Sequence, residues 1–221
     1  MNEDHAMSPD AVSDAAVIRR YRRALIPMIA AALPLTLAGW LALYWLPPPL
    51  AGTENPGSRL LYALGWSCVA ILLAFVTGIE AVAHRRLFSR AIDPLAGAES
   101  AATKVDLRYL QHTLEQLVVF LPGLFGLAYY CNGPRSVHAV TATAILWVIG
   151  RCAFWIGYHR GSDWRGLGAP GMLLSMLVLL YVVFRFGYDW AGLIGGLAPI
   201  ALFLVIEARL FHLARRDGAK H

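Results

Sequence analysis

Charged side chains are scarce in this sequence and absent from long stretches of it. Asp, Glu, Lys and Arg make up 15% of the 221 residues, hydrophobic residues make up 58%, and the mean hydropathy is +0.55. A typical soluble domain has about 25% charged residues and about 45–50% apolar ones. No charged residue occurs in six windows: 24–53, 60–79, 116–134, 136–150, 166–184 and 190–206. These windows predict membrane-spanning segments.

The length of the windows favours α-helices over the strands of a membrane barrel. A helix crosses the hydrocarbon core with about 20 residues, and most of the windows are that long. The fourth window reaches this length only when Arg151 is included. Barrel strands would be about half as long and would alternate in polarity, which these windows do not. We therefore predict six membrane helices, near residues 24–46, 60–83, 107–130, 137–159, 168–187 and 189–212.

The sequence also lacks the usual signatures of disulfides, metals and nucleotides. The cysteines form no CxxC pair or metal-ligand spacing, so we expect free thiols buried in or beside apolar segments. A phosphate-binding glycine loop is not indicated either, because the last glycine cluster lies inside an apolar window, where close helix packing accounts for it. The residues concerned are Cys68, Cys131, Cys152, Gly192, Gly195 and Gly196.

The distribution of Lys and Arg along the chain predicts the topology. Basic residues cluster before the first predicted helix, around 85–108, at 160–165 and after 214, whereas the intervening loops hold only Arg59, Arg135 and Arg185. Cytoplasmic loops carry the excess of positive charge. We therefore expect both termini in the cytoplasm and a multi-pass protein of the bacterial inner membrane. The net charge of +5 follows from this topology, so the lipid bilayer is an expected partner and nucleic acid is not.

Ionisable residues inside the predicted spans are the strongest indication of a functional site. Such residues cost about 2.5–3.5 kcal/mol each near the centre of a membrane helix. Arg108, His112 and Glu115 follow an i, i+4, i+7 spacing and so share one face of the third predicted helix. We expect this face to meet a partner or a polar cavity, and the alternative is an ion pair that only fixes helix packing.

A second group of polar residues closes the fourth predicted helix. Arg151 and Tyr158 share a face with Phe154 between them, and Arg151 lies about two turns inside the span. Arg160 and Arg165 follow at the interface, where basic side chains commonly extend toward water. Arg85 and Arg86 end the second predicted helix on the same side of the membrane. This convergence of charges suits a small zwitterionic or anionic ligand that is reached from the cytoplasm.

At these residues the sequence resembles the family of membrane-associated proteins in eicosanoid and glutathione metabolism, MAPEG. The family pattern R-x-x-x-N-x-x-E corresponds to Arg108, His112 and Glu115. A second pattern near the end of the family's third helix corresponds to Arg151, Ala153, Phe154, Gly157, Tyr158 and Arg160, followed by Arg165. The family's Arg-Arg pair at the end of its first helix corresponds to Arg85 and Arg86. Together the motifs extend over roughly residues 60–187.

The resemblance implies an all-α fold, a polytopic membrane helix bundle whose protomers assemble as a homotrimer. We expect a MAPEG-like four-helix core at residues 59–187. Residues 19–58 would add an extra N-terminal membrane helix and a loop, and residues 188–221 a C-terminal membrane helix and a basic tail. Residues 1–18 are polar and acidic, which is typical of a disordered tail.

The resemblance also implies a chemistry, that of a glutathione S-transferase with a possible related peroxidase activity. Glutathione, the co-substrate, would lie between subunits and meet Arg85, Arg108, His112, Glu115, Arg151 and Tyr158. Arg86 and Arg165 match the basic residues near its thiol, where a guanidinium would stabilise the thiolate for attack on a hydrophobic electrophile. No metal takes part in this scheme.

Three departures from the family pattern keep other functions open. His112 replaces an Asn, Phe154 stands where some members have Tyr, and Ala153 stands where one branch has Arg. A MAPEG-like scaffold without catalysis is therefore one alternative. A small-molecule transporter is another, although a transporter would be expected to show an internal repeat or a helix broken near the midplane.

The predicted topology can be tested by cysteine labelling. Single cysteines at Thr53 and Ser162 in a cysteine-free background should react with a membrane-impermeant maleimide from opposite sides, since three predicted helices, an odd number, separate the two positions. Reaction of both positions from the same side would contradict six crossings.

Overall fold

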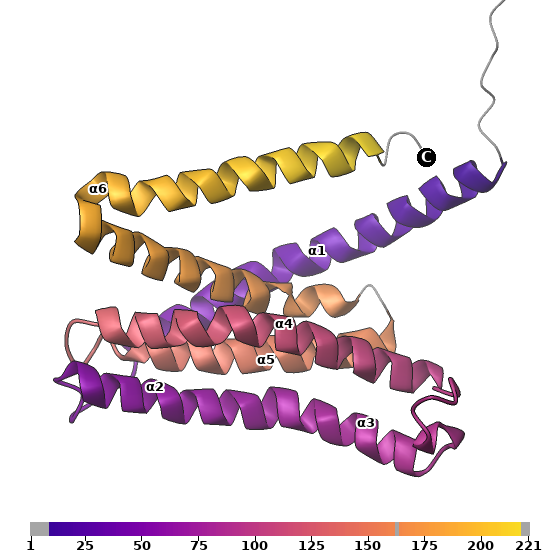
Figure 1. The fold of residues 1–221 in the computed structure, drawn as a ribbon, viewed down its shortest axis with the longest axis horizontal. Coiled ribbons are helices and arrows are strands. Elements are labelled where there is room, and N and C mark those ends of the chain that lie inside the picture. Colours follow the sequence, from indigo (N-terminus) through magenta and orange to yellow (C-terminus); the bar gives the residue numbers. More distant parts are fainter. Residues whose placement is uncertain (1–8, 162–163, 218–221) are drawn as a thin grey trace, which may run out of the picture. The chain divides into compact units, whose positions relative to one another are not determined.

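The computed structural model describes residues 9–161 and 164–217, which form helices joined by short loops (Figure 1). The elements are α1 (Pro9–Trp45), α2 (Pro56–Ala70), the π-helix η1 (Ile71–Val76), α3 (Thr77–Leu87), the 3₁₀ turn η2 (Arg90–Ile92), α4 (Ala101–Tyr130), α5 (His138–Arg160), the 3₁₀ turn η3 (Trp164–Gly168) and α6 (Ala169–Asp217). The chain divides into two compact units, residues 28–182 and residues 1–27 with 183–221. All the predicted site residues lie in the first unit.

The core of the first unit lies where α2, η1, α4 and α5 meet. Small side chains dominate it, which lets the helix backbones approach closely, as is usual within a membrane. The aromatic rings of Phe120 and Trp147 stack in its centre with their centroids 4.4 Å apart. The buried alanines around them are Ala63, Ala70, Ala74, Ala128 and Ala144. The expected all-α helix bundle is therefore confirmed.

The outer surface of the helices is apolar, as a lipid environment requires. Leu61, Val118 and Ile149 are large hydrophobic residues that are more than half exposed. Five helices in the described part of the chain are long and apolar enough to cross a membrane. An exposed apolar surface of this extent would aggregate in water but is solvated by acyl chains. The protein is an integral, multi-pass membrane protein.

The last two predicted helices belong to one element, α6, which reverses direction at Ala191 and Gly192 (Figure 1). Gly192 has a φ of 60°, a conformation that glycine adopts without the clash of a Cβ. After the turn the backbones touch, and a Cβ on Gly187 would lie 2.2 Å from the carbonyl oxygen of Gly195. The expected close packing is found at Gly195 and Gly196. The same expectation for Gly192 was wrong, because this residue makes the turn.

The helices begin earlier than the apolar windows suggested. α1 starts at Pro9, so residues 9–18 are helical where a disordered tail was expected, and residues 1–8 lie outside the described part. α4 starts at Ala101 rather than near 107, because the hydroxyl of Ser100 accepts the amide proton of Thr103 at 3.1 Å. Hydropathy windows indicate which part of a helix lies in the lipid, whereas the capping residue determines where the helix begins.

A buried arginine joins the loop before α2 to the end of α4. Arg59 donates to the carbonyl oxygens of Ala128 at 3.2 Å and of Glu54 at 3.1 Å. Ala128 lies in the last turn of α4, where carbonyl oxygens have no partner within the helix. The guanidinium of Arg59 therefore supplies both a hydrogen bond and a favourable positive charge there. Thr53 is buried in this loop, so the exposed neighbour Ala51 is the better labelling position. Ser162, the other labelling position, lies outside the described residues.

Candidate functional site

A row of polar side chains runs along the exposed face of α4. Arg108 donates to Gln111 Oε1 at 3.1 Å, and Gln111 donates to Glu115 Oε1 at 3.0 Å. His112 Nδ1 lies 3.1 Å from the other carboxylate oxygen of Glu115. In the described chain the hydrogen bonds of these four side chains all stay on α4. The predicted face is therefore one connected network on the exposed side of α4, and the His112 ring also meets Phe154 of α5 with the centroids 6.0 Å apart.

Arg151 lies beneath this row and has no carboxylate to neutralise it. It is only 4% exposed, and one terminal nitrogen donates to Thr113 Oγ1 at 2.8 Å. Its guanidinium lies over the rings of Phe154 at 4.7 Å and Tyr109 at 5.2 Å. Among the described residues no acidic side chain is within ion-pair distance, and the Nε atom has no hydrogen-bond partner. An unpaired buried cation attracts an anion strongly.

The ring of Tyr109 is fixed by the π-helix η1. Its hydroxyl donates to the carbonyl oxygen of Ala74 at 2.7 Å, and Ala74 lies inside η1. A π-helix shifts the backbone hydrogen-bond pattern, and such segments often occur at functional sites. Tyr109 also stacks on Trp155, with the ring centroids 4.8 Å apart. The irregular turn thus positions an aromatic ring against the guanidinium of Arg151.

A second line of contacts connects α5 with η3. The ring of Phe154 packs against Tyr158 at 5.7 Å, and the guanidinium of Arg165 lies 5.9 Å from the centre of the Tyr158 ring. Glycine allows this approach, since a Cβ on Gly157 would lie 2.5 Å from the carbonyl oxygen of Trp164. The contact between backbones therefore holds Arg165 beside Tyr158.

An open cavity of about 460 Å³ lies between α4 and the end of α5. Arg108, Gln111 and Tyr158 line it, together with Lys104 from the first turn of α4. Its size falls in the range of small-molecule sites, about 300–1,000 Å³. His112, Glu115 and Arg165 reach the same region through the contacts described above. Six of the predicted site residues are thereby connected: Arg108, His112, Glu115, Arg151, Tyr158 and Arg165.

Arg85 and Arg86 have other partners within the chain. Arg85 forms an ion pair with Asp106, and Arg86 pairs with Glu99 at 3.3 Å. Neither side chain contacts the cavity between α4 and α5 in the described protomer. Arg85 donates a hydrogen bond from Nε to the fully buried carboxylate of Asp106, so Arg85 has a structural role in the protomer.

Asp106 was not anticipated from the sequence, yet it joins three helices. Its side chain is completely buried. Besides Arg85 of α3, it accepts a hydrogen bond from Trp155 Nε1 at 2.8 Å and contacts His159 Nε2 at 2.5 Å, both on α5. Removal of one member of a buried ion pair leaves an uncompensated charge. The sequence feature that could have indicated Asp106 is its position on the buried face of α4, three residues before Tyr109.

Comparison with known proteins identifies the family. A family model named MAPEG family matches residues 59–188. The chain belongs to the MAPEG family. This confirms the resemblance seen in the motifs, and the matched range contains every predicted site residue. The family includes glutathione transferases, so a role for glutathione is expected for it in general terms.

A curated relative and the solved structures add little beyond the family. An uncharacterized protein of Synechocystis sp. is 36% identical over 75 residues, which is 34% of this chain and 52% of the relative. The chain thus spans about half the length of the curated relative it matches. No solved structure gives a significant match. In the described residues no group of three His, Cys, Asp or Glu side chains is arranged to hold a metal ion.

The role of Asp106 leads to a stability prediction. Asp106→Asn should lower the free energy of unfolding by about 2–3 kcal/mol, because Arg85, Trp155 and His159 lose the charged acceptor of their hydrogen bonds. Glu99→Gln is the matched control, since Glu99 is less buried than Asp106 and bonds only to Arg86 in the described chain, so this change should cost only about 1 kcal/mol. Thermal unfolding of both variants in one detergent measures the difference. Equal shifts in the midpoint would contradict the assignment of Asp106 as the main link between these helices.

Proposed function

We propose that this protein binds glutathione at the surface between α4 and α5 and activates its thiol for attack on a hydrophobic electrophile. The observation that carries the proposal is the buried guanidinium of Arg151, which lacks a carboxylate partner in the described chain and lies under a row of polar groups. Membership of a family that contains glutathione transferases gives independent support.

The charges of the site complement those of glutathione. The tripeptide carries two carboxylates and one ammonium group at neutral pH. Arg108 and Lys104 line the open cavity and would bind a carboxylate, and Arg151 would attract the other. Glu115, exposed and linked to His112 and Gln111, is the matching acceptor for the ammonium group. Hydrogen bonds to ionised groups are stronger than neutral ones, so such a site would favour a zwitterionic peptide.

The exposure of this polar row supports an assembly in which a second subunit covers it. Arg108, Gln111 and Glu115 bond to one another on the outer face of a membrane helix, where lipid would leave the rest of their polar groups unsolvated. A homotrimer with one site at each interface would enclose the row and the ligand. In such an assembly Arg85 and Arg86 would reach a site from a neighbouring subunit.

The proposed reaction requires mainly a positive charge near the glutathione sulfur. A free thiol has a pKa of about 8.5, so most of it is protonated at neutral pH. Arg165, beside Tyr158, and Arg86 would stabilise the thiolate, while the proton passes to water. The sulfur then forms a bond to the electrophilic carbon, and either a leaving group departs with the bonding electrons or the adduct takes up a proton. Arginine stays protonated throughout, and its contribution is electrostatic.

One contact favours the alternative of a non-catalytic scaffold. The ring of Phe154 lies over the guanidinium of Arg151, and this side chain is almost completely covered. A ligand carboxylate would reach Arg151 only after Phe154 turns aside. The transporter alternative gains no such support, because the break in α6 separates two predicted spans instead of interrupting one.

Loss of the carboxylate on α4 should weaken glutathione binding. We expect Glu115→Gln to raise the dissociation constant about tenfold or more, because the ammonium group loses its charged acceptor. Glu80→Gln is the matched control, since Glu80 is also an exposed carboxylate paired with a histidine on its own helix, His84 at 3.8 Å. Isothermal titration calorimetry of the purified protein with glutathione measures both.

The wild-type titration decides between the proposal and the scaffold. Binding that Glu115→Gln weakens and Glu80→Gln leaves unchanged supports the proposed site. Absence of glutathione binding to the folded wild-type protein would overturn the proposal. Equal weakening by both variants would contradict the role given to Glu115.

The thiolate should depend on arginine in a pH-dependent way. Arg165→Ala should raise the apparent pKa of bound glutathione, so kcat should fall at neutral pH and recover as the pH rises above the new pKa. The same test applies to Arg86→Ala. Arg160→Ala is the control, because Arg160 is exposed at the end of α5 outside the cavity. Thiolate absorbance and a pH–rate profile with an aromatic electrophile provide the measurements, and an unshifted profile would exclude Arg165.

A further inference from the structure

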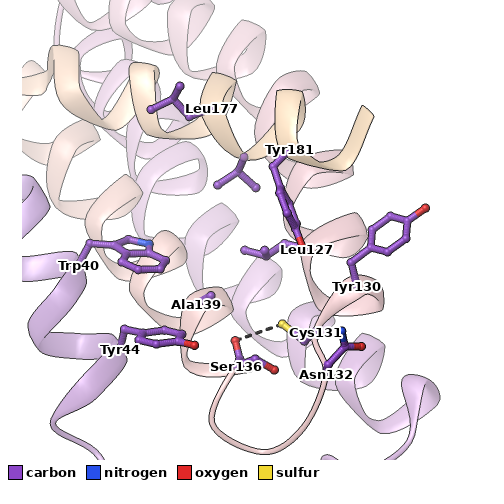
Figure 2. Close-up of a pocket in the computed structure, with 11 residues that line it drawn as sticks. Trp40, Tyr44, Leu127, Tyr130, Cys131, Asn132, Ser136, Ala139, Leu177 and Tyr181 are labelled. Carbon is purple, nitrogen blue, oxygen red and sulfur yellow. Dashed lines mark hydrogen bonds between the residues drawn. The ribbon is translucent and has the colours of Figure 1, made fainter. Parts of the chain in front are cut away.

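Two further cavities lie along α1, the helix that precedes the family core. The first, about 420 Å³, is bounded by α1, by the loop between α4 and α5, and by α6 (Figure 2). The second, about 320 Å³, continues along α1 and α6. Trp40 and Leu177 line both, so the two form one groove. The family match begins at residue 59, and α1 therefore adds this groove to the shared core.

The two ends of the groove differ in chemistry. One end is apolar, with Leu33, Leu37 and Leu173 along its walls. The other end carries uncharged polar groups, the hydroxyls of Tyr44 and Tyr181 and the side-chain amide of Asn132 (Figure 2). No charged residue lines either part of the groove in the described chain.

Several polar groups at this end are free to bind a ligand. In the described structure no hydrogen bond is made by the hydroxyls of Tyr44 and Tyr181 or by the side chain of Asn132. Neighbouring groups are already engaged, since Trp40 Nε1 donates to Thr143 at 3.2 Å and the Ser136 hydroxyl donates to Gly133 at 2.8 Å. In a membrane such unpaired groups favour a ligand with oxygen acceptors.

The polar end lies where helices begin and end. α1 ends at Trp45, α4 ends at Tyr130, and α5 begins at His138. Aromatic residues with polar atoms gather at the level of lipid headgroups. The apolar arm then extends from this level toward the membrane interior, which is the orientation of a lipid-like molecule with its head at the interface.

We propose that this groove binds an elongated neutral amphiphile, with its uncharged oxygen-bearing head at Tyr44, Asn132 and Tyr181 and its apolar chain along α1 and α6. An anionic lipid does not fit as well, because no cationic side chain lines the groove in the described chain. The nearby Arg135 is directed at Trp45, since it donates to the carbonyl oxygen of that residue at 3.1 Å and lies over its ring. Burial raises the pKa of the Cys131 thiol, so this group adds no charge to the polar end.

A photoreactive monoacylglycerol with a diazirine in its acyl chain tests the proposal on the full-length protein in detergent micelles. Mass spectrometry of the labelled peptides should locate the probe on residues 33–44 and 170–181. Labelling should saturate and be displaced by unlabelled monoolein. The fatty acid with the same diazirine chain is the comparison probe, because its head carries a negative charge at neutral pH.

Two variants make the test specific. Leu177→Trp fills the junction of the groove and should reduce saturable labelling about fivefold or more, whereas Leu61→Trp adds the same bulk on an exposed part of α2 and should leave it unchanged. Tyr44→Phe keeps the ring and should weaken competition by monoolein about two- to tenfold through loss of one hydrogen bond. Size-exclusion chromatography first shows that each variant elutes at the same volume as the wild type and is therefore folded.

Three results would overturn the proposal. Labelling that never saturates, or that Leu177→Trp leaves unchanged, would show that the probe reports bulk lipid. Preference for the fatty acid probe would contradict a neutral head. Labelling that is insensitive to Tyr44→Phe would remove the head site. None of these results depends on glutathione, so the outcome is independent of the proposed transferase function.

Discussion

The buried carboxylate of Asp106 is the interaction on which the packing of the core depends. Arg85 from α3 and both Trp155 and His159 from α5 converge on it, so one anion fixes three helices. A charge inside a membrane protein persists only where opposite charge and hydrogen bonds compensate its desolvation. Arg151 is compensated differently, by one hydroxyl and two rings. Asp106 thus finds a cationic partner within the chain, whereas Arg151 has no carboxylate partner among the described residues.

Aromatic rings connect the packing of the core to the proposed site. Tyr109 stacks on Trp155, which donates to Asp106, and the same ring lies against the guanidinium of Arg151. Its hydroxyl is held by the backbone of η1. A disturbance at Asp106 would therefore reach Arg151 through two rings. The position of the Arg151 guanidinium is therefore set by the same aromatic packing that joins Asp106 to the core.

The sequence predicted the membrane helices well, because apolar runs of about 20 residues without charge are rare outside membrane spans. The sequence also predicted that Arg108, His112 and Glu115 share one face of α4, because helical spacing alone determines which residues share a face. It missed Asp106, whose partners come from other helices and follow from tertiary contacts. It also missed the covering of Arg151 by Phe154, because side-chain rotamers are not encoded in spacing. Which residues a neighbouring subunit contributes stays a prediction for the same reason.

The turn at Gly192 has a consequence for how the chain enters the membrane during synthesis. The two arms of α6 on either side of it can insert as a paired hairpin, because their backbones already touch through Gly187 and Gly195. Between residues 166 and 206 the only charges are Arg185 and Asp189, both close to the tip. Under the predicted topology this tip crosses the bilayer, so one positive and one negative charge move together and the net charge carried across is zero.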